Sequence, residues 1–218
     1  MYPDSLEKGE TVAASTKALP SKRQHRLKAQ IEFIREIDKL KLVLRQTLLM
    51  DGSRRENSVE HSWHIAVTVL ILSEYSGRED IDILRVLKML LVHDVIEIDA
   101  GDTYCYDHQG LKSQAQREQK AADRIFNLLP EDQGQSLRGL WDEFEARETP
   151  ESMLANALDR FQPLLHNFFT EGLVWRRNRI KSSQVLMRMQ PIKFGAPLLW
   201  DFVKDIVGDS VAKGYLLP

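Results

Sequence analysis

The sequence predicts an all-α protein that folds as a compact single-domain helical bundle. Apolar residues recur at spacings of three and four along most of the chain, which is the pattern of amphipathic helices. No segment alternates apolar and polar residues with a period of two for long enough to require a sheet. A chain of 218 residues suits one domain and can bury a core without disulfides or a structural metal.

The N-terminal part predicts a tail followed by two helices. Residues 1–21 are polar, contain two prolines and show no periodicity, so we expect a mobile tail ahead of a domain over residues 22–218. Apolar residues from Leu27 to Leu48 fall on one stripe and predict a single helix that Asp51-Gly52 ends. A second helix is expected from about residue 58 to 75, with Asn57 or Ser58 as its cap. Its predicted inward residues are Val59, Trp63, Ala66, Val67, Leu70 and Ile71.

A third helix is expected over roughly residues 81–98, and its centre, Met89-Leu90-Leu91-Val92, is apolar all round. Such a helix is buried centrally. After a loop over residues 102–112, helices are expected near 113–129 and 131–146. Thr149-Pro150 then gives a start signal for a long helix, because proline is favoured at the first helical position. Two shorter helices, near 182–189 and 196–207, close the chain.

Charge and cysteine content exclude several classes of function. Lys plus Arg is 30 against Asp plus Glu 32, so the net charge of -2 gives no bulk positive field for a nucleic-acid polymer. The single cysteine, Cys105, excludes an internal disulfide and a cysteine-based zinc site. No apolar run approaches the roughly 20 residues that span a bilayer. The N-terminus lacks the apolar core of a signal peptide, so we expect a cytoplasmic protein without a membrane partner.

The sharpest polar cluster is His93-Asp94 with Glu97 on the buried third helix. Buried histidines and carboxylates cost free energy unless they are paired, protonated or bound to a metal. Spacings of three and four place the group on one wedge of the helix. A structural role is the alternative, with His93 bonded to a backbone carbonyl and Asp94 paired with an arginine, but three such residues together favour a site.

Two further residues extend this cluster. His61 lies in the first turn of the second helix, in Glu60-His61-Ser62-Trp63-His64, and could instead be a capping or surface histidine. Asp159 interrupts an apolar helix four residues before Pro163, where a bend is expected, and a salt bridge to Arg160 is its structural alternative. Two imidazoles and two carboxylates on three helices suit one divalent transition metal with open coordination positions.

These motifs resemble the HD-domain metal-dependent phosphohydrolases, and most closely their 5'-deoxynucleotidase-like branch. That branch shows Arg-x-Glu-Asn-x-x-Glu-His-Ser, which Arg54–Ser62 matches. It also shows His-Asp-x-x-Glu followed by Gly-Asp, matched by His93-Asp94, Glu97 and Gly101-Asp102. The similarity runs from about residue 27 to 175, and the family fold is a compact helical bundle.

The resemblance implies that His61, His93, Asp94 and Asp159 ligate one divalent metal ion per chain, without distinguishing Mn, Co, Fe, Zn, Ni and Mg. It implies that Glu97 and Asp102 act beside the metal on water and leaving group, and which of them is the acid stays open. His64 is not part of the motif. Family members often dimerise, which is the only ground for expecting a homodimer.

A phosphate-bearing substrate also needs cations, and Arg45, Arg54 and Lys112 are the candidates. In the nucleotidases a tryptophan follows the arginine over the substrate, whereas this chain has Arg45-Gln46-Thr47. The expected function is therefore release of phosphate from a small phosphomonoester, a nucleoside or deoxynucleoside 5'-monophosphate. The alternative is a non-catalytic sensor that binds a nucleotide or metal. The presence of both Glu97 and Asp102 favours the enzyme.

Overall fold

The computed structural model describes residues 21–107 and 109–218, and it confirms the all-α class. The predicted N-terminal tail lies outside the described residues, except for Ser21, which begins the first helix. The only sheet in the described residues is one antiparallel pair of strands. The α-helices and strands in chain order are α1 (Ser21–Ile37), β1 (Leu44–Leu48), β2 (Arg55–Asn57), α2 (Ser58–Leu72), α3 (Ile83–Val92), α4 (Glu97–Ala100), α5 (Leu111–Phe126), α6 (Glu131–Ala146), α7 (Pro150–Phe169), α8 (Leu173–Arg177), α9 (Ser182–Arg188), α10 (Gln190–Gly195) and α11 (Trp200–Ala212). Short 3₁₀ helices are η1 (Asp38–Leu42), η2 (Ser73–Ser76), η3 (His93–Ile96) and η4 (Pro197–Leu199).

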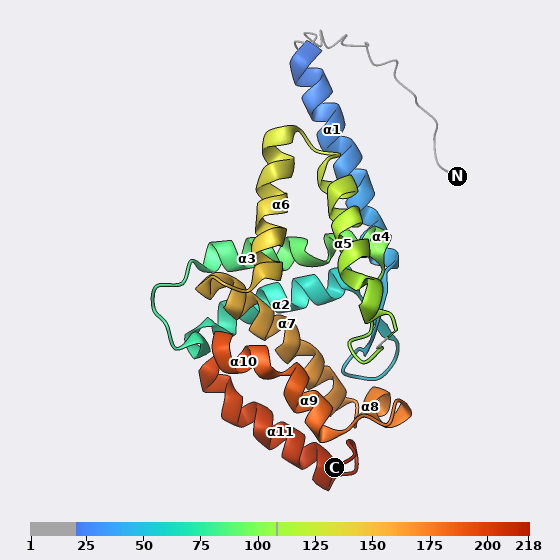
Figure 1. Cartoon of the computed structure of the whole chain (residues 1–218), viewed down its shortest axis with the longest axis vertical. Coiled ribbons are helices and arrows are strands. Elements are labelled where there is room, and N and C mark those ends of the chain that lie inside the picture. The colour runs from blue at the N-terminus through green and yellow to red at the C-terminus, as the bar shows by residue number, and fades with distance from the viewer. Residues whose placement is uncertain (1–20, 108) are drawn as a thin grey trace, which may run out of the picture.

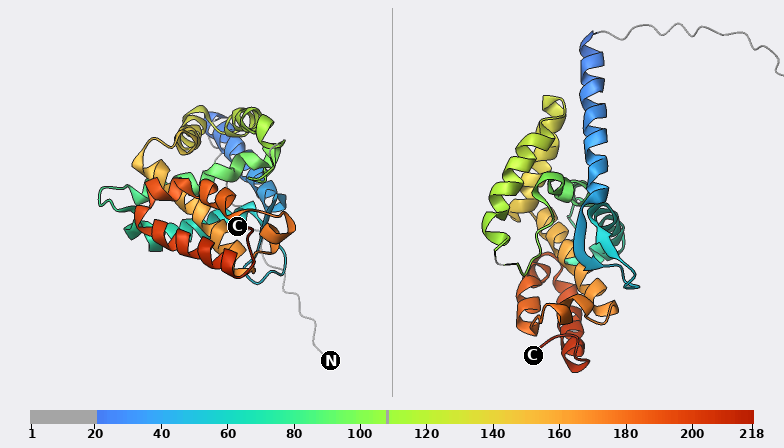
Figure 2. Two further views of the ribbon diagram at one scale, coloured as in Figure 1. Left: turned by 60° about the horizontal axis from the view of Figure 1, so that its bottom comes forward. Right: turned by 90° about the vertical axis from the view of Figure 1, so that its right-hand side faces the viewer.

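Helix α7 is the central element, and α2, α3, α6 and α10 pack against it (Figure 1). It begins as predicted, with Thr149 as its cap and Pro150 in its first turn. Leu154, Leu158 and Leu164 of α7 are buried in the main hydrophobic core. A second core joins α1 and η1 to α5 and α6, and the helices α8 to α11 close the opposite end of the molecule (Figure 2).

The prediction of a single helix from Leu27 to Leu48 is wrong. Helix α1 ends at Ile37, the chain passes through η1, and Val43 turns to an extended conformation that leads into β1. Strand β1 pairs with β2 across a tight connection in which Gly52 takes a positive φ of 72°. Backbone hydrogen bonds between the strands replace those of a helix, and Leu44 is 48% exposed, so the helical spacing of Leu44 and Leu48 does not mark a buried face.

The predicted inward face of the second helix is also wrong, apart from Ala66, which is buried, and Val59, which is partly buried against the second core. Trp63, Leu70 and Ile71 are 65%, 61% and 64% exposed. The buried residues of α2 are Ser58, His61, Ser62, Ile65, Ala66 and Val69. The helix is rotated so that His61 faces α7, and its most apolar side faces outward.

The predicted third helix, residues 81–98, is three successive helices. α3 ends at Val92, η3 carries His93 and Asp94, and α4 begins at Glu97. This change of winding lies at the predicted polar cluster, where all four residues of η3 are buried. Among the described residues, no helix is both long enough and apolar enough to cross a membrane.

Candidate metal centre

The four predicted metal ligands come from three helices that contact one another. His61 is in the first turn of α2, which the Asn57 side chain caps by accepting the N–H groups of Val59 and Glu60. His93 and Asp94 lie on η3, and Asp159 lies near the middle of α7. All four are buried. The structure therefore brings together residues that are up to 98 positions apart in the chain.

One ligand atom from each of His61, His93 and Asp94 lies within 4.8 Å of the others, and Asp159 Oδ1 lies close to both histidines. His61 Nε2 lies 2.9 Å from Asp159 Oδ1 and 3.9 Å from Asp94 Oδ2. His93 Nε2 lies 2.9 Å from Asp94 Oδ1 and 3.7 Å from Asp159 Oδ1. A nitrogen-rich and oxygen-rich set of this size suits a divalent transition metal and leaves coordination positions open.

The hydrogen bonding of His93 supplies a test of whether a cation fits. Its Nδ1 lies 2.9 Å from the Leu90 carbonyl oxygen, which can only accept, so this nitrogen carries a proton. Its Nε2 is buried and, within the described residues, makes no hydrogen bond of acceptable geometry. A bound metal ion would give this buried nitrogen the partner it lacks. The hydrogen bond from Nδ1 to a backbone carbonyl is typical of metal-ligating histidines. The residues present therefore fit a divalent metal.

The local electrostatics also favour a cation. Burial opposes protonation of His93, but the charges of Asp94 and Asp159 outweigh it and raise the pKa of His93 to about 10. The same arrangement lowers the pKa of Asp94 to about 2 despite its burial. Arg45 Nη1 lies 2.9 Å from Asp94 Oδ2 and contributes to this shift. Both carboxylates are therefore ionised at neutral pH and available as ligands.

Glu97 and Asp102 lie beside this centre, and their pKa values are raised, whereas that of Asp94 is lowered. Burial and the charge of Asp94 hold the pKa of Glu97 well above its usual range. The Ser58 hydroxyl donates a hydrogen bond to Glu97 Oε2 at 2.6 Å. Burial also raises the pKa of Asp102, which follows Gly101 at a positive φ of 72°. Carboxyl groups with raised pKa values beside a ligand cluster are candidates for proton transfer.

Only one of the three predicted substrate cations is at the centre. Arg45 is partly buried on β1, where its guanidinium reaches Asp94. Arg54 is exposed and pairs with Glu60 at 2.6 Å. Lys112 is exposed and bonds to Gln109. Neither Arg54 nor Lys112 lines either of the two pockets beside the centre, and only their charge had suggested them.

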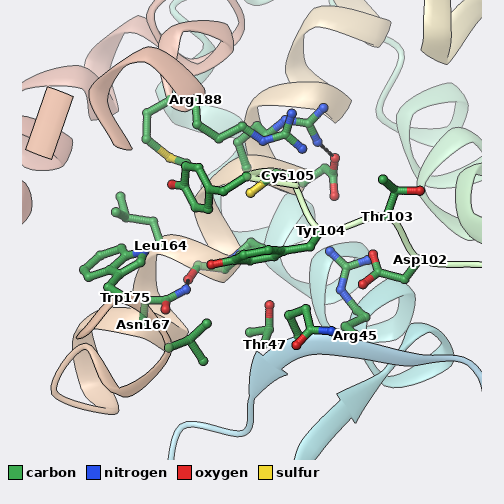
Figure 3. Close-up of a pocket in the computed structure, with 17 residues that line it drawn as sticks. Arg45, Thr47, Asp102, Thr103, Tyr104, Cys105, Leu164, Asn167, Trp175 and Arg188 are labelled. Carbon is green, nitrogen blue, oxygen red and sulfur yellow. Dashed lines mark hydrogen bonds and ion pairs between the residues drawn. The ribbon is translucent and has the colours of Figure 1, made fainter. Parts of the chain in front are cut away.

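Two adjoining pockets open beside the centre and contain residues that sequence analysis missed. Both are lined by Arg45, Asp102, Asp159, Arg160 and Arg188. The polar pocket also contains His93, Asp94, Glu97, Gln114, Glu118, Glu145 and Arg147. The aromatic pocket (Figure 3) also contains Thr47, Tyr104, Tyr106, Leu164, Asn167 and Trp175.

Arg188 is the most informative of the missed residues. In residues 21–107 and 109–218 it has neither an ion-pair nor a hydrogen-bond partner, unlike Arg160, which pairs with Asp159. Burial and the nearby charge of Arg160 lower the pKa of Arg188 to about 10. An unpaired, half-buried cation in a pocket has the chemistry to bind an anion. It lies on α9, far from every motif, so no local pattern indicates it.

Comparison with known proteins agrees with the geometry. A family model described as HD domain matches residues 37–200. The 5'-deoxynucleotidase HDDC2 of Homo sapiens is 28% identical over 158 residues, covering 72% of this chain and 76% of that protein. The protein of the same name from Dictyostelium discoideum is 30% identical over 143 residues, covering 63% of this chain and 75% of its own length.

Two solved structures resemble the fold. The crystal structure of a "predicted metal-dependent phosphohydrolase" from Magnetospirillum magnetotacticum has a TM-score of 0.87 and 48% identity. It covers 92% of this chain and 100% of its own. A conserved hypothetical protein from Pyrococcus furiosus has a TM-score of 0.58 at 21% identity, covering 81% of this chain and 98% of its own, and supports the fold alone.

Proposed function

The chain belongs to the HD-domain family and is an HD-domain phosphohydrolase; we propose that it removes the phosphate of a nucleoside or deoxynucleoside 5'-monophosphate. One observation carries the proposal. Four buried ligand-type residues converge beside two carboxyl groups with raised pKa values, and the site opens into pockets that hold both cations and aromatic rings. The curated relatives, named 5'-deoxynucleotidases, support the choice of substrate class.

We assign His61, His93, Asp94 and Asp159 as the ligands of one divalent ion, which supplies Lewis acidity toward a phosphoryl oxygen when bound. Phosphate-monoester hydrolysis is among the slowest uncatalysed reactions, so the site must stabilise much negative charge. Arg45, Arg160 and Arg188 provide fixed positive charge around the same cavity. Such preorganised charge is effective in a partly desolvated site.

Glu97 and Asp102 divide the proton transfers of the reaction. A water oxygen forms a bond to phosphorus, the ester P–O bond breaks, and the leaving alkoxide takes up a proton. One carboxyl group accepts the proton of the attacking water, and the other protonates the leaving oxygen. Burial and the charge of Asp94 raise the pKa of Glu97 and of the partly buried Asp102 above their usual values, which suits both groups to proton transfer.

The aromatic pocket suits the nucleoside. Gln46-Thr47 offers no ring after Arg45, but Tyr104 and Trp175 line the same pocket (Figure 3). The Tyr104 hydroxyl is buried and has no hydrogen-bond partner among the described residues, so a polar group of the substrate can pair with it. The same pocket is lined by Arg188 and Asp159, so a nucleoside bound there would lie next to a cation and a proposed metal ligand.

A substrate panel tests the proposal. Phosphate release is measured for nucleoside and deoxynucleoside 5'-monophosphates, triphosphates and cyclic diesters, with manganese, cobalt, iron and magnesium in turn. We expect monophosphates to be hydrolysed preferentially. Cleavage of triphosphates or diesters with every monophosphate intact overturns the substrate class. Binding of metal and nucleotide without phosphate release favours the sensor instead.

We also propose that the enzyme is a homodimer and acts in the cytoplasm. The exposed apolar side chains of Trp63, Val67, Leu70 and Ile71 recur along one face of α2 and support a protein interface. Light scattering should give about twice the chain mass of 25.2 kDa, and Leu70→Glu should reduce it to the mass of one chain. A free Cys105 is compatible with a reducing compartment, and fractionation of cells that express the protein tests the location.

A further inference from the structure

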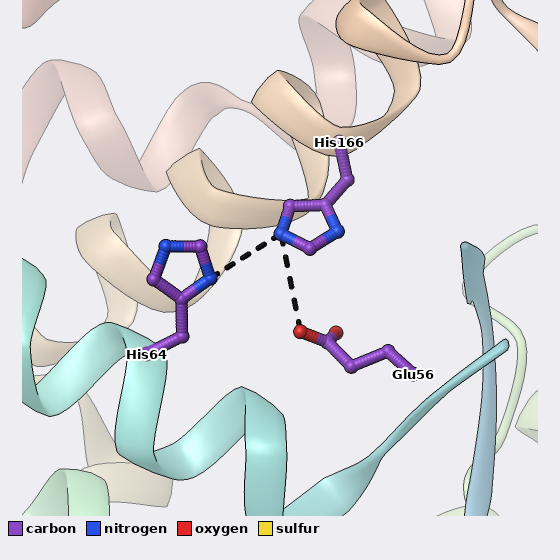
Figure 4. Close-up of side chains that lie close together, drawn as sticks. All are labelled: Glu56, His64 and His166. Atoms are coloured by element: carbon purple, nitrogen blue, oxygen red, sulfur yellow. Dashed lines mark hydrogen bonds and ion pairs between the residues drawn. The ribbon is translucent and has the colours of Figure 1, made fainter. Parts of the chain in front are cut away.

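A second buried polar cluster lies against His61. It contains Glu56 in the middle of β2, His64 on α2, and Gln162 and His166 on α7. Glu56 and Gln162 are each 1% exposed, and His166 is 2% exposed. Figure 4 shows the side chains of Glu56, His64 and His166 pointing toward one another. The proposed mechanism uses none of these four residues.

The contacts of His166 fix the orientation of the Gln162 amide. His166 Nδ1 lies 2.7 Å from the carbonyl oxygen of Leu48, which can only accept a hydrogen bond. Burial lowers the pKa of His166, so the ring is neutral and its Nε2 carries a lone pair. That nitrogen is 2.9 Å from Gln162 Nε2, which is also 2.6 Å from Glu56 Oε1. Both acceptors require the NH₂ end of the amide, so its oxygen must point the other way.

The amide oxygen of Gln162 faces His61. It lies 3.1 Å from His61 Nδ1, and since an amide oxygen only accepts, this nitrogen must carry the proton. In a neutral imidazole the lone pair is then on Nε2, which faces Asp159. We propose that Gln162 is a positioning residue that holds His61 in its Nδ1–H tautomer, with Nε2 free for the metal. The inference rests on the proposed function in one respect, namely that His61 is a metal ligand.

The order of contacts extends the support beyond Gln162. The Leu48 carbonyl fixes His166, His166 and Glu56 fix the amide of Gln162, and the amide fixes His61. Strand β1 therefore supports the site at both ends, because it also carries Arg45. Outer partners of this kind orient ligands, and losing one typically lowers metal affinity about 10- to 100-fold.

A second metal ion is the competing interpretation of the cluster. One ligand atom from each of Glu56, His64 and His166 lies within 4.8 Å of the others. However, Gln162 Nε2 is 2.6 Å from Glu56, 2.9 Å from His166 and 3.2 Å from His64, so it occupies the point on which they converge. An ion there would displace the amide and break its bond to His61.

Two substitutions at Gln162 separate positioning from packing. Gln162→Met has similar size but no acceptor for His61. Gln162→Glu keeps an acceptor oxygen but buries a second carboxyl group beside Glu56. Asn156→Leu is the matched control, because Asn156 is also buried on α7 and bonds only to the Phe144 and Ser152 carbonyls. Metal affinity is measured by titration with Co²⁺, stability by thermal unfolding, and the His61 tautomer by ¹⁵N NMR of the metal-free protein.

If Gln162 positions His61, the two variants should rank differently in the two measurements. Gln162→Glu should bind metal more tightly than Gln162→Met, but it should be the less stable of the two. Gln162→Met should lose about 10- to 100-fold in metal affinity and the fixed tautomer, whereas Gln162→Glu should keep both. Gln162→Glu should nevertheless unfold at the lower temperature, because a second buried carboxyl group is costly. Asn156→Leu should lose stability without losing affinity.

Three results would overturn the inference. They are an Nε2–H tautomer of His61 in the wild type, unchanged affinity in Gln162→Met, or two bound ions of which one is lost in His166→Phe. Failure of the proposed metal site can be distinguished from failure of this inference. If the wild-type protein binds no Co²⁺, the NMR measurement on the metal-free protein still gives the tautomer of His61.

Discussion

Replacing Glu97 by glutamine should remove most of the turnover while leaving the fold and the bound metal in place. Glu97 is 8% exposed, and its Oε2 accepts the Ser58 hydroxyl at 2.6 Å. Glutamine has the same size, and its amide oxygen can accept the same hydrogen bond. The substitution therefore creates no cavity and removes only the ability to hold and transfer a proton.

The expected loss follows from the role of a positioned acid or base. Such groups contribute about 100- to 10,000-fold, which corresponds to about 2.7–5.4 kcal/mol of activation free energy at 1.36 kcal/mol per tenfold. The stability of Glu97→Gln, in contrast to its turnover, should not fall and should tend to rise. Burial and Asp94 raise the pKa of Glu97, so ionisation at neutral pH costs the folded state more than the unfolded chain. Glutamine removes that cost.

The assay combines phosphate release, metal content and unfolding at several pH values. We expect the Glu97→Gln protein to be at least as stable as the wild type at pH 7, with a difference that shrinks as the pH falls toward the usual glutamate pKa. Glu145→Gln is the matched control, because Glu145 lines the same polar pocket and burial also raises its pKa. Undiminished turnover in Glu97→Gln, or an equal loss in Glu145→Gln, refutes the reasoning.

Three further substitutions test the site and the fold. Asp94→Ala should empty the metal site and lower the unfolding temperature, because the ion is linked to folding, and full metal occupancy would contradict the ligand assignment. Arg188→Gln should raise KM about 10- to 100-fold, the scale of a hydrogen bond to a charged group, whereas the exposed Arg179→Gln should not; equal KM values would remove Arg188 from the site. Glu36→Gln should lower stability at neutral pH, because Lys39 and Arg124 lower the pKa of Glu36. The stabilisation by ionised Glu36 is lost as the pH falls through its folded-state pKa. If wild type and Glu36→Gln differed in stability by the same amount at pH 3 and pH 7, this role of Glu36 would be excluded.

The residues proposed as metal ligands were predictable because their chemistry conflicts with their surroundings. His93, Asp94 and Asp159 interrupt apolar helices, and a buried polar residue needs a partner whatever the tertiary structure. Their convergence on one point required the structure. The substrate cations carry no such conflict, since an arginine on a helix is compatible with solvent. Arg188 and Arg54 therefore look alike in the sequence, and only the packing of α9 beside α7 distinguishes them.

The strand β1 could not be predicted for a different reason. Leu40, Leu44 and Leu48 follow the spacing of a helix, and the local sequence contains no proline to oppose it. The extended conformation is set by pairing with β2, so it depends on contacts across the turn at Gly52. Strand propensity is generally more dependent on such tertiary context than helix propensity.

The inverted face of α2 connects the errors of prediction to function. A hydrophobic pattern alone would bury Trp63, Leu70 and Ile71 and expose His61, and this arrangement would remove more apolar surface from water. The structure instead buries the side that carries Ser58, His61 and Ser62. A polar inward face lowers stability unless its groups are satisfied. Here Glu97 accepts from Ser58, Gln162 and Asp159 pair with His61, and the Ser62 hydroxyl donates to the Ser58 carbonyl. The outward apolar face then needs a partner of its own, which is why the same rotation that forms the metal centre also supports the proposed dimer.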